Sequence, residues 1–113
     1  MNLHRLRIFV ITLLIASSTH CQYLKPSLPV AVTYRSSMVG QGYVAQFHNT
    51  SGKYLQVYAE FENHTFNERK NMALNLAPYS TQEIGWMEGW KFTSGETIKL
   101  FHSDYAPAFY TIP

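Results

Sequence analysis

The sequence contains a single cysteine, Cys21, among its 113 residues. A chain with one cysteine can form no internal disulfide, which excludes the disulfide-stapled scaffolds on which small secreted eukaryotic domains rely. Whatever part of this chain folds must therefore be stabilised by packing and hydrogen bonding alone.

The sequence also has no long hydrophobic run. Its longest apolar stretch, Ile8 to Ala16, is interrupted by Thr12 and spans roughly 14 Å as a helix. A bilayer core is about 30 Å thick, so this stretch does not predict a transmembrane helix. The basic residues Arg5 and Arg7 precede it and small polar residues follow, an order typical of a secretory signal peptide. We therefore expect residues 1–21 to be an export signal. Together with the lack of disulfides, this favours the bacterial periplasm or secretion from a bacterium.

Cys21 lies at the end of this leader, where a bacterial lipoprotein carries its lipidated residue. The preceding Ser18, Thr19 and His20 differ from the aliphatic and small residues of a lipoprotein signal. Cleavage after Ser18, before Cys21 and after Cys21 all stay open. Cys21 is the candidate lipidation residue, and we expect contact with the outer membrane only if it is lipidated.

Beyond the leader there is no surplus of charge. The chain has nine Lys and Arg against seven Asp and Glu, and removal of Arg5 and Arg7 leaves seven of each. Nucleic-acid binding requires Lys and Arg clustered in excess on one face, so we expect no nucleic-acid partner.

The sequence also lacks residue patterns typical of catalytic or metal-binding sites. His48, His64 and His102 lie on three separate segments, without the spacing of a metal site. Ser36, Ser37 and Ser51 have no nucleophile-elbow context. The sequence therefore predicts neither an enzyme nor a cofactor, metal or catalytic site.

What the sequence does contain is strand-like alternation. After a proline-containing spacer at 22–29, short stretches rich in Val, Tyr, Phe, Thr and Ile alternate with Gly, Asn, Ser and Pro. The expected strands are 31–35, 42–48, 54–62, 70–76, 82–86, 97–102 and 108–112. The good helix formers at 71–77 offer a helical alternative, but a period of two fits their apolar positions better. Seven short strands in 30–113 predict an all-β, immunoglobulin-like antiparallel β-sandwich. The turn at 49–52 predicts an antiparallel hairpin between the second and third strands.

The third strand divides most clearly into two faces. Leu55, Val57, Ala59 and Phe61 alternate with a polar and tyrosine-bearing set, Tyr54, Gln56, Tyr58, Glu60 and Glu62. Glu60 and Glu62 are expected to be solvated, to pair with a neighbouring Lys or Arg, or to form an acidic strip. Tyrosine combines an apolar ring with a polar tip and is enriched at interfaces. Tyr54 and Tyr58 are therefore candidate binding residues, with cross-strand packing on a solvated sheet as the alternative.

The segment Glu83 to Leu100 reads EIGWMEGWKFTSGETIKL. With its EIGWxEGWxFxxGE-type motif, the region 32–113 resembles uncharacterised small exported bacterial domains of the immunoglobulin-like β-sandwich class. That resemblance implies a fold and no activity. Gly85 and Gly89 predict a tight turn that brings Trp86 and Trp90 to one end of the sandwich. The tryptophans are expected either to plug the core or to form an exposed aromatic platform for a sugar or peptide.

Two N-glycosylation acceptor patterns, at Asn49 and Asn63, are expected in surface loops. They are ordinary turn residues in a bacterial host and glycan sites in a eukaryotic one. We expect Asp104 to cap the turn at 103–107.

These observations predict an exported, non-enzymatic binding or accessory protein of the bacterial envelope, such as an inhibitor or immunity-type protein. Its expected partner is another protein, held through Tyr54 and Tyr58. The alternative is a carbohydrate- or peptidoglycan-binding module that uses Trp86 and Trp90.

Overall fold

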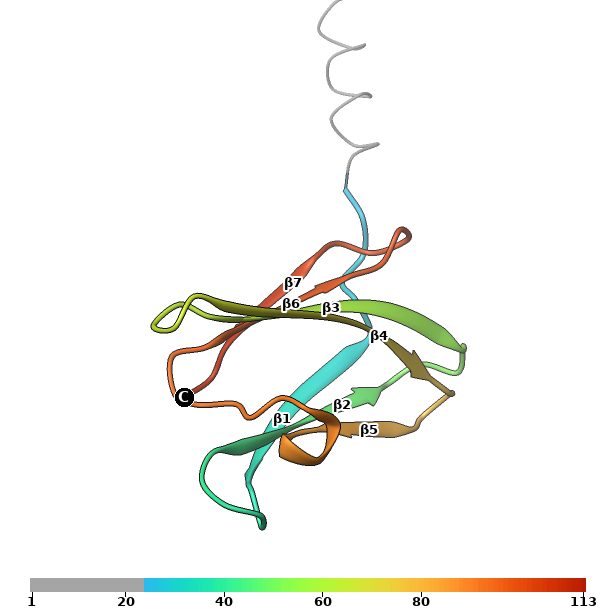
Figure 1. Cartoon of the computed structure of the whole chain (residues 1–113). Helices are drawn as coiled ribbons and strands as arrows, with labels where there is room; N and C mark the ends of the chain where they lie inside the picture. Colours follow the sequence, from blue (N-terminus) through green and yellow to red (C-terminus); the bar gives the residue numbers. More distant parts are fainter. Residues whose placement is uncertain (1–23) are drawn as a thin grey trace, which may run out of the picture.

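The computed structural model describes residues 24–113 (Figure 1). The expected export signal and Cys21 lie outside these residues. Within 24–113 no helix is long and apolar enough to cross a membrane.

Seven strands build the described part of the chain, and each boundary lies within two residues of its predicted position. They are β1 Val30–Ser36, β2 Tyr43–Asn49, β3 Leu55–Asn63, β4 Glu68–Leu76, β5 Thr81–Ile84, β6 Thr97–Phe101 and β7 Ala108–Thr111. The segment with helical composition forms β4. The predicted fifth strand ends two residues early, because Trp86 begins a short 3₁₀ helix, η1, at Trp86–Glu88.

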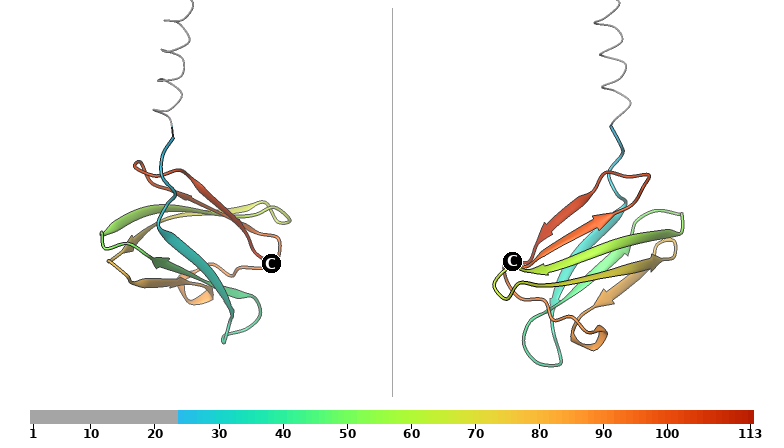
Figure 2. Two further views of the ribbon diagram at one scale, coloured as in Figure 1. Left: turned by 180° about the vertical axis from the view of Figure 1, so that it is seen from behind. Right: turned by 45° about the horizontal axis from the view of Figure 1, so that its top comes forward.

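The strands form two antiparallel sheets that pack face to face (Figures 1 and 2). One sheet has the order β1-β2-β5 and the other β4-β3-β6-β7. The predicted immunoglobulin-like β-sandwich is thus confirmed. Three connections form hairpins within a sheet, and the other three cross between sheets at 50–54, 77–80 and 85–96.

The predicted hairpin between the second and third strands is wrong, because β2 and β3 belong to different sheets. Asn49, fully buried, explains this geometry. Its Nδ2 donates to the carbonyl oxygens of Lys53 at 2.7 Å and of Leu76 and Ala77 at 3.2 Å, while its Oδ1 accepts from Ser51 N–H. The turn is therefore fixed to the end of β4, across the sandwich, and carries the chain from one sheet to the other.

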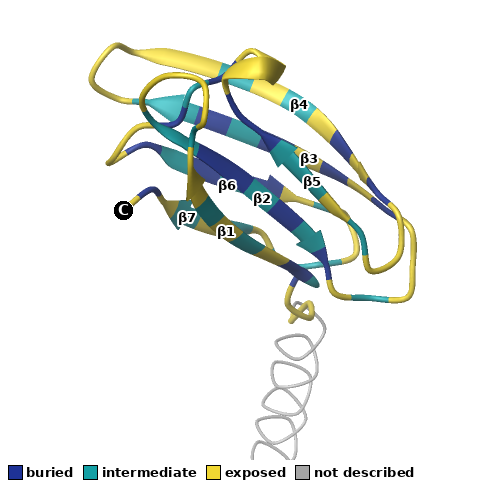
Figure 3. Cartoon of the chain, turned by 90° about the horizontal axis from the view of Figure 1, so that it is seen from below, coloured by how far each residue is buried: buried dark blue, intermediate teal, exposed yellow. Residues whose placement is uncertain are grey.

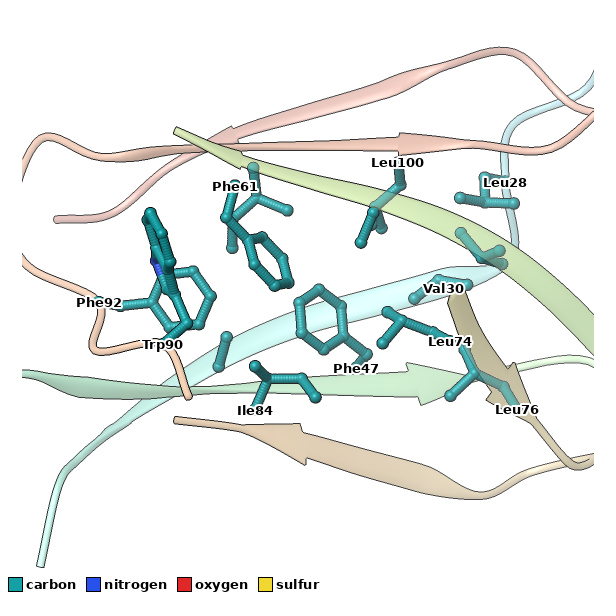
Figure 4. Packing of buried hydrophobic residues seen from close by; sticks show 14 of the residues in the cluster. Leu28, Val30, Phe47, Phe61, Leu74, Leu76, Ile84, Trp90, Phe92 and Leu100 are labelled. Carbon is teal, nitrogen blue, oxygen red and sulfur yellow. The ribbon is translucent and has the colours of Figure 1, made fainter. Parts of the chain in front are cut away.

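The core lies between the sheets and follows the predicted alternation (Figure 3). Leu55, Val57, Ala59 and Phe61 of β3 are all buried. At one end the core is aromatic: Phe61 packs edge-on against Phe92 with ring centroids 4.9 Å apart, and Phe47 and Trp90 complete the cluster (Figure 4).

Candidate binding surface

The outer face of the four-stranded sheet carries two exposed aromatic rings side by side. Tyr58 of β3 and Phe101 of β6 are direct cross-strand partners. Directly opposed residues in an antiparallel sheet project on the same face. Tyr58 is 60% exposed and Phe101 37% exposed, so neither is covered within its own sheet. A third ring, Phe109 of β7, is exposed opposite Lys99 in the neighbouring cross-strand row.

Tyr58 and Phe101 border a surface groove of about 530 Å³. The hairpin between β6 and β7 forms one wall, and the segment preceding β1 contributes Lys25. The lining residues are Lys25, Gln56, Tyr58, Phe101, His102, Ser103, Tyr105 and Pro107. Aromatic rings in a concave site with a few polar groups at its border are typical of binding sites.

The wall of this groove is held in place by one ring contact and two hydrogen bonds. The ring of His102 packs edge-on against Tyr105 at 5.0 Å, and its Nδ1 accepts from Asp104 N–H at 3.1 Å. The expected turn cap is thus provided by the His102 ring, and Asp104 contributes its backbone N–H. Lys25 Nζ donates to Ser103 O at 2.8 Å, which ties the segment before β1 to the tip of the hairpin. The groove is therefore preformed within the described residues.

The structure separates the two candidate tyrosines. Tyr54 is 62% exposed, but it precedes β3 and does not line the groove. Its exposure nearly equals that of Tyr58. It therefore provides a matched tyrosine outside the groove.

The carboxylates on the same face are paired. Arg69 of β4 places Nη2 3.3 Å from Glu62 Oε1 and Nη1 3.9 Å from Glu60 Oε1. The expected pairing with a neighbouring basic residue is thus present. Because these ion pairs are partly exposed, each adds little stability. They do offset the negative charge of the face, which leaves the aromatic rings as its distinguishing feature.

The two candidate tryptophans lie in different environments. Trp90 is only 9% exposed and belongs to the core, whereas Trp86 is 59% exposed on η1. Gly89, in the left-handed region with φ of 95°, reverses the chain between them. The expectation of a core plug holds for Trp90, and the expected platform of two exposed indoles is wrong.

Trp86 forms part of a second apolar patch beside the β1–β2 connection. This connection lies at the end of the sandwich opposite the point where the described chain begins (Figure 1). Met38, Val39 and Met87 are exposed there with it, around a cavity of about 80 Å³.

The remaining candidates occupy ordinary structural positions. Within 24–113 no cluster of three or more His, Cys, Asp or Glu could hold a metal ion. His48 Nδ1 lies 2.8 Å from Thr81 Oγ1, and His64 Nε2 lies 3.2 Å from Thr97 Oγ1. The expectation that both glycosylation patterns lie in surface loops is wrong for Asn49, which is buried. Asn63 is partly exposed and its Oδ1 caps the β3–β4 turn by accepting from Thr65 N–H.

Comparison with known proteins gives no relative. No family model, no curated protein and no solved structure matches this chain. The likeness to small exported bacterial domains stays a prediction, and the functional argument depends on the geometry of the surface.

Proposed function

We propose that this chain is an exported, non-enzymatic binding module of the bacterial envelope that docks a partner protein through the Tyr58–Phe101 groove. The observation that carries the proposal is the cross-strand pair of exposed rings at the edge of a preformed groove. An inhibitor or immunity-type protein acts in this way, by covering a surface of its partner.

Energetics favour these rings as anchors. Aromatic residues bury a large apolar area and lose little conformational entropy on binding, and they dominate the energetics of interfaces. Covering a water-exposed ring contributes the most binding free energy, about 25 cal/mol per Å² of apolar area removed from water. The hydrogen bonds that fix the 102–107 hairpin lower the entropic cost of docking, because the wall is already ordered.

Charge indicates the kind of partner surface. Lys25 is the one Lys, Arg, Asp or Glu among the described residues that line the groove, and Arg69 pairs with Glu60 and Glu62 outside it. The groove therefore presents no strong net charge to a partner. A partner that presents an apolar side chain surrounded by polar groups fits this site. Association driven by a strongly basic partner does not.

Site-specific photo-crosslinking in the native host tests the proposal. The full chain carries a photo-reactive phenylalanine analogue at position 101 or, as the matched control, at position 54. We expect irradiation to produce one discrete protein adduct from position 101 and none from position 54. Equal adducts from both positions, or none from 101, would overturn the proposal.

The partner identified in this way is then purified and titrated. Loss of a binding anchor costs about 2 kcal/mol, so we expect Tyr58→Ala and Phe101→Ala each to weaken binding about 30-fold. Tyr54→Ala and Trp86→Ala should change the affinity less than about threefold. Calorimetric titration with a panel of envelope glycans provides the remaining comparison. Glycan binding that Tyr58→Ala abolishes, without any protein adduct, would assign the groove to a sugar and overturn the protein partner.

A further inference from the structure

The two sheets end in four edge strands, and three of them are protected against pairing with another chain. β4 carries the consecutive charges of Glu68–Lys70, and β5 has only four residues before the chain turns into η1. At the start of β7, the segment before β1 covers the edge, where Ala106 N–H donates to Pro26 O at 2.9 Å. Charge, shortness and coverage are the usual means by which sheet edges avoid association.

Beyond Val30, whose carbonyl oxygen accepts from Tyr110 O–H at 3.4 Å, the edge of β1 has none of these protections. It is seven residues long with the sequence VAVTYRS, without proline or lysine. Its single charged residue is Arg35. The side chain of Arg35 extends over β2 toward β5, where its Nε donates to Glu83 Oε2 at 2.6 Å. β-Branched residues and an uncharged centre make this edge suited to accept another strand.

The hydrogen-bond pattern identifies the backbone groups available on this edge. Two bonds flank the β1–β2 ladder, Thr50 N–H to Pro29 O and Ser37 N–H to Gly42 O, each at 2.9 Å. Because bonded pairs alternate in an antiparallel ladder, the odd-numbered residues between them bond to β2 and the even-numbered residues face outward. Val32 and Tyr34 therefore direct two N–H and two C=O groups away from β2, with no partner strand among residues 24–113.

We propose that two copies of this chain associate through β1, joining their three-stranded sheets across a two-fold axis at Thr33. In this register Val32 of each copy bonds to Tyr34 of the other, which uses all four outward backbone groups of Val32 and Tyr34. Thr33 faces Thr33 of the second copy, and Ala31 faces Arg35. A register centred on Arg35 would instead place two guanidinium groups opposite each other.

Side chains support the same register. On the inner face, Val32 and Tyr34 are half-buried at the border of the core. Pairing places Val32 beside Tyr34 of the second copy, an aromatic and β-branched cross-strand pair. The joined sheet has the order β5-β2-β1-β1-β2-β5, so the short β5 strands form both of its outer edges. Assembly thus stops at a dimer, as a closed two-fold interface requires.

The proposal is independent of the Tyr58–Phe101 groove, which lies on the other sheet, and failure of either leaves the other standing. Sedimentation equilibrium of the exported protein, purified from its host, measures the oligomeric state. We expect twice the monomer mass, with a dissociation constant that Thr33→Lys raises at least tenfold by opposing two ammonium groups at the axis. Thr111→Lys makes the same change at the β7 edge and should leave the dimer intact. A monomer at every concentration up to about 1 mM would overturn the proposal.

Cysteine crosslinking defines the register. Non-bonded antiparallel pairs have Cα atoms about 4.5 Å apart, within disulfide range. In a Cys21→Ser background, Thr33→Cys should therefore form a disulfide-linked dimer under oxidising conditions, and Ala31→Cys should not. Equal crosslinking of both variants, a dimer broken by Thr111→Lys alone, or a Thr33→Cys adduct with a different protein would each contradict it.

Discussion

The indole Nε1–H of Trp90 donates to Glu96 Oε1 across 3.0 Å, and both side chains are buried. The second carboxylate oxygen accepts from the backbone N–H of Thr93 and from its Oγ1–H at 2.6 Å. Three donors thus satisfy a carboxylate that is only 2% exposed. The Trp and Glu of the C-terminal motif close the aromatic end of the core.

Replacement of Glu96 tests this arrangement. Glu96→Ala leaves the indole N–H and two Thr93 donors without their acceptor inside the protein, which should cost about 3 kcal/mol of unfolding free energy. Glu96→Gln keeps one carbonyl acceptor and should cost roughly half as much. Urea unfolding measures both. Glu68→Ala on exposed β4 is the control, expected within about 0.5 kcal/mol of the wild type, and equal effects of all three changes would contradict the role of Glu96.

The different burial of the two tryptophans should be measurable in solution, both in their contributions to stability and in their fluorescence. Trp90→Ala empties part of the core and should cost about 3–5 kcal/mol, whereas Trp86→Ala should cost less than about 1 kcal/mol. Acrylamide quenching checks the same difference optically. We expect the exposed Trp86 to be quenched readily and Trp86→Phe to remove most of the quenchable emission. If Trp90→Phe removed it instead, the two assignments would be reversed.

The strands could be predicted from the sequence because alternation is a local property. In β3, Leu55, Val57 and Ala59 lie at every second position, and one face is consequently buried wherever the strand is placed. Pairing is not local. The turn at Asn49 has hairpin composition, yet its amide bonds to carbonyls 27 and 28 residues away. No spacing within the turn indicates those partners.

The same limit explains what was missed at the surface. Tyr58 was identified from its face on β3, but Phe101 could not be assigned to that face without the register between β3 and β6. Periodicity likewise could not separate Trp86 from Trp90. Their different burial depends on η1 and on the left-handed Gly89 between them.

Asn49 itself yields a stability prediction. Asn49→Ala removes a buried side chain that makes hydrogen bonds to three carbonyls and two donors of Ser51, and should cost about 2–4 kcal/mol. Asn75→Ala, at an exposed position of β4, is the matched control and should be nearly neutral. Thermal and urea unfolding of both variants provide the measurement. Equal destabilisation would show that the crossing connections at 50–54 and 77–80 do not depend on Asn49.

Substitutions at two glycines of the β1–β2 connection distinguish the cost of backbone strain from the cost of a steric clash with a neighbouring residue. Gly40 and Gly42 both have positive φ, 91° and 102°. A Cβ on Gly40 would meet nothing within 4 Å, whereas one on Gly42 would lie 2.6 Å from the carbonyl oxygen of Phe92. Gly40→Ala should therefore cost about 1 kcal/mol from strain alone, and Gly42→Ala several times more. Urea unfolding distinguishes the two, and comparable losses would argue against the close contact with Phe92.

The Arg35–Glu83 pair predicts the acid dependence of stability. The hydrogen bond from Arg35, followed by that from Gln46, lowers the pKa of Glu83 below its ordinary value of 4.5. A folded-state pKa below the unfolded value means that ionised Glu83 stabilises the fold above about pH 4.5, and that this contribution is lost as the pH falls through the lowered pKa. The melting temperature of the wild type should exceed that of Glu83→Gln near pH 6, and the difference should shrink steadily as the pH falls below 4.5.

Because both side chains of this pair are substantially exposed, the difference should be small and should shrink in high salt. Glu68→Gln, on the exposed edge strand β4, provides the comparison for a general effect of removing a carboxylate. Calorimetric melting of the three proteins across this pH range measures the dependence. A difference between wild type and Glu83→Gln that stayed constant as the pH fell would mean that its origin is packing on the β1-β2-β5 sheet, since protonation of Glu83 itself is the titration that the two proteins do not share.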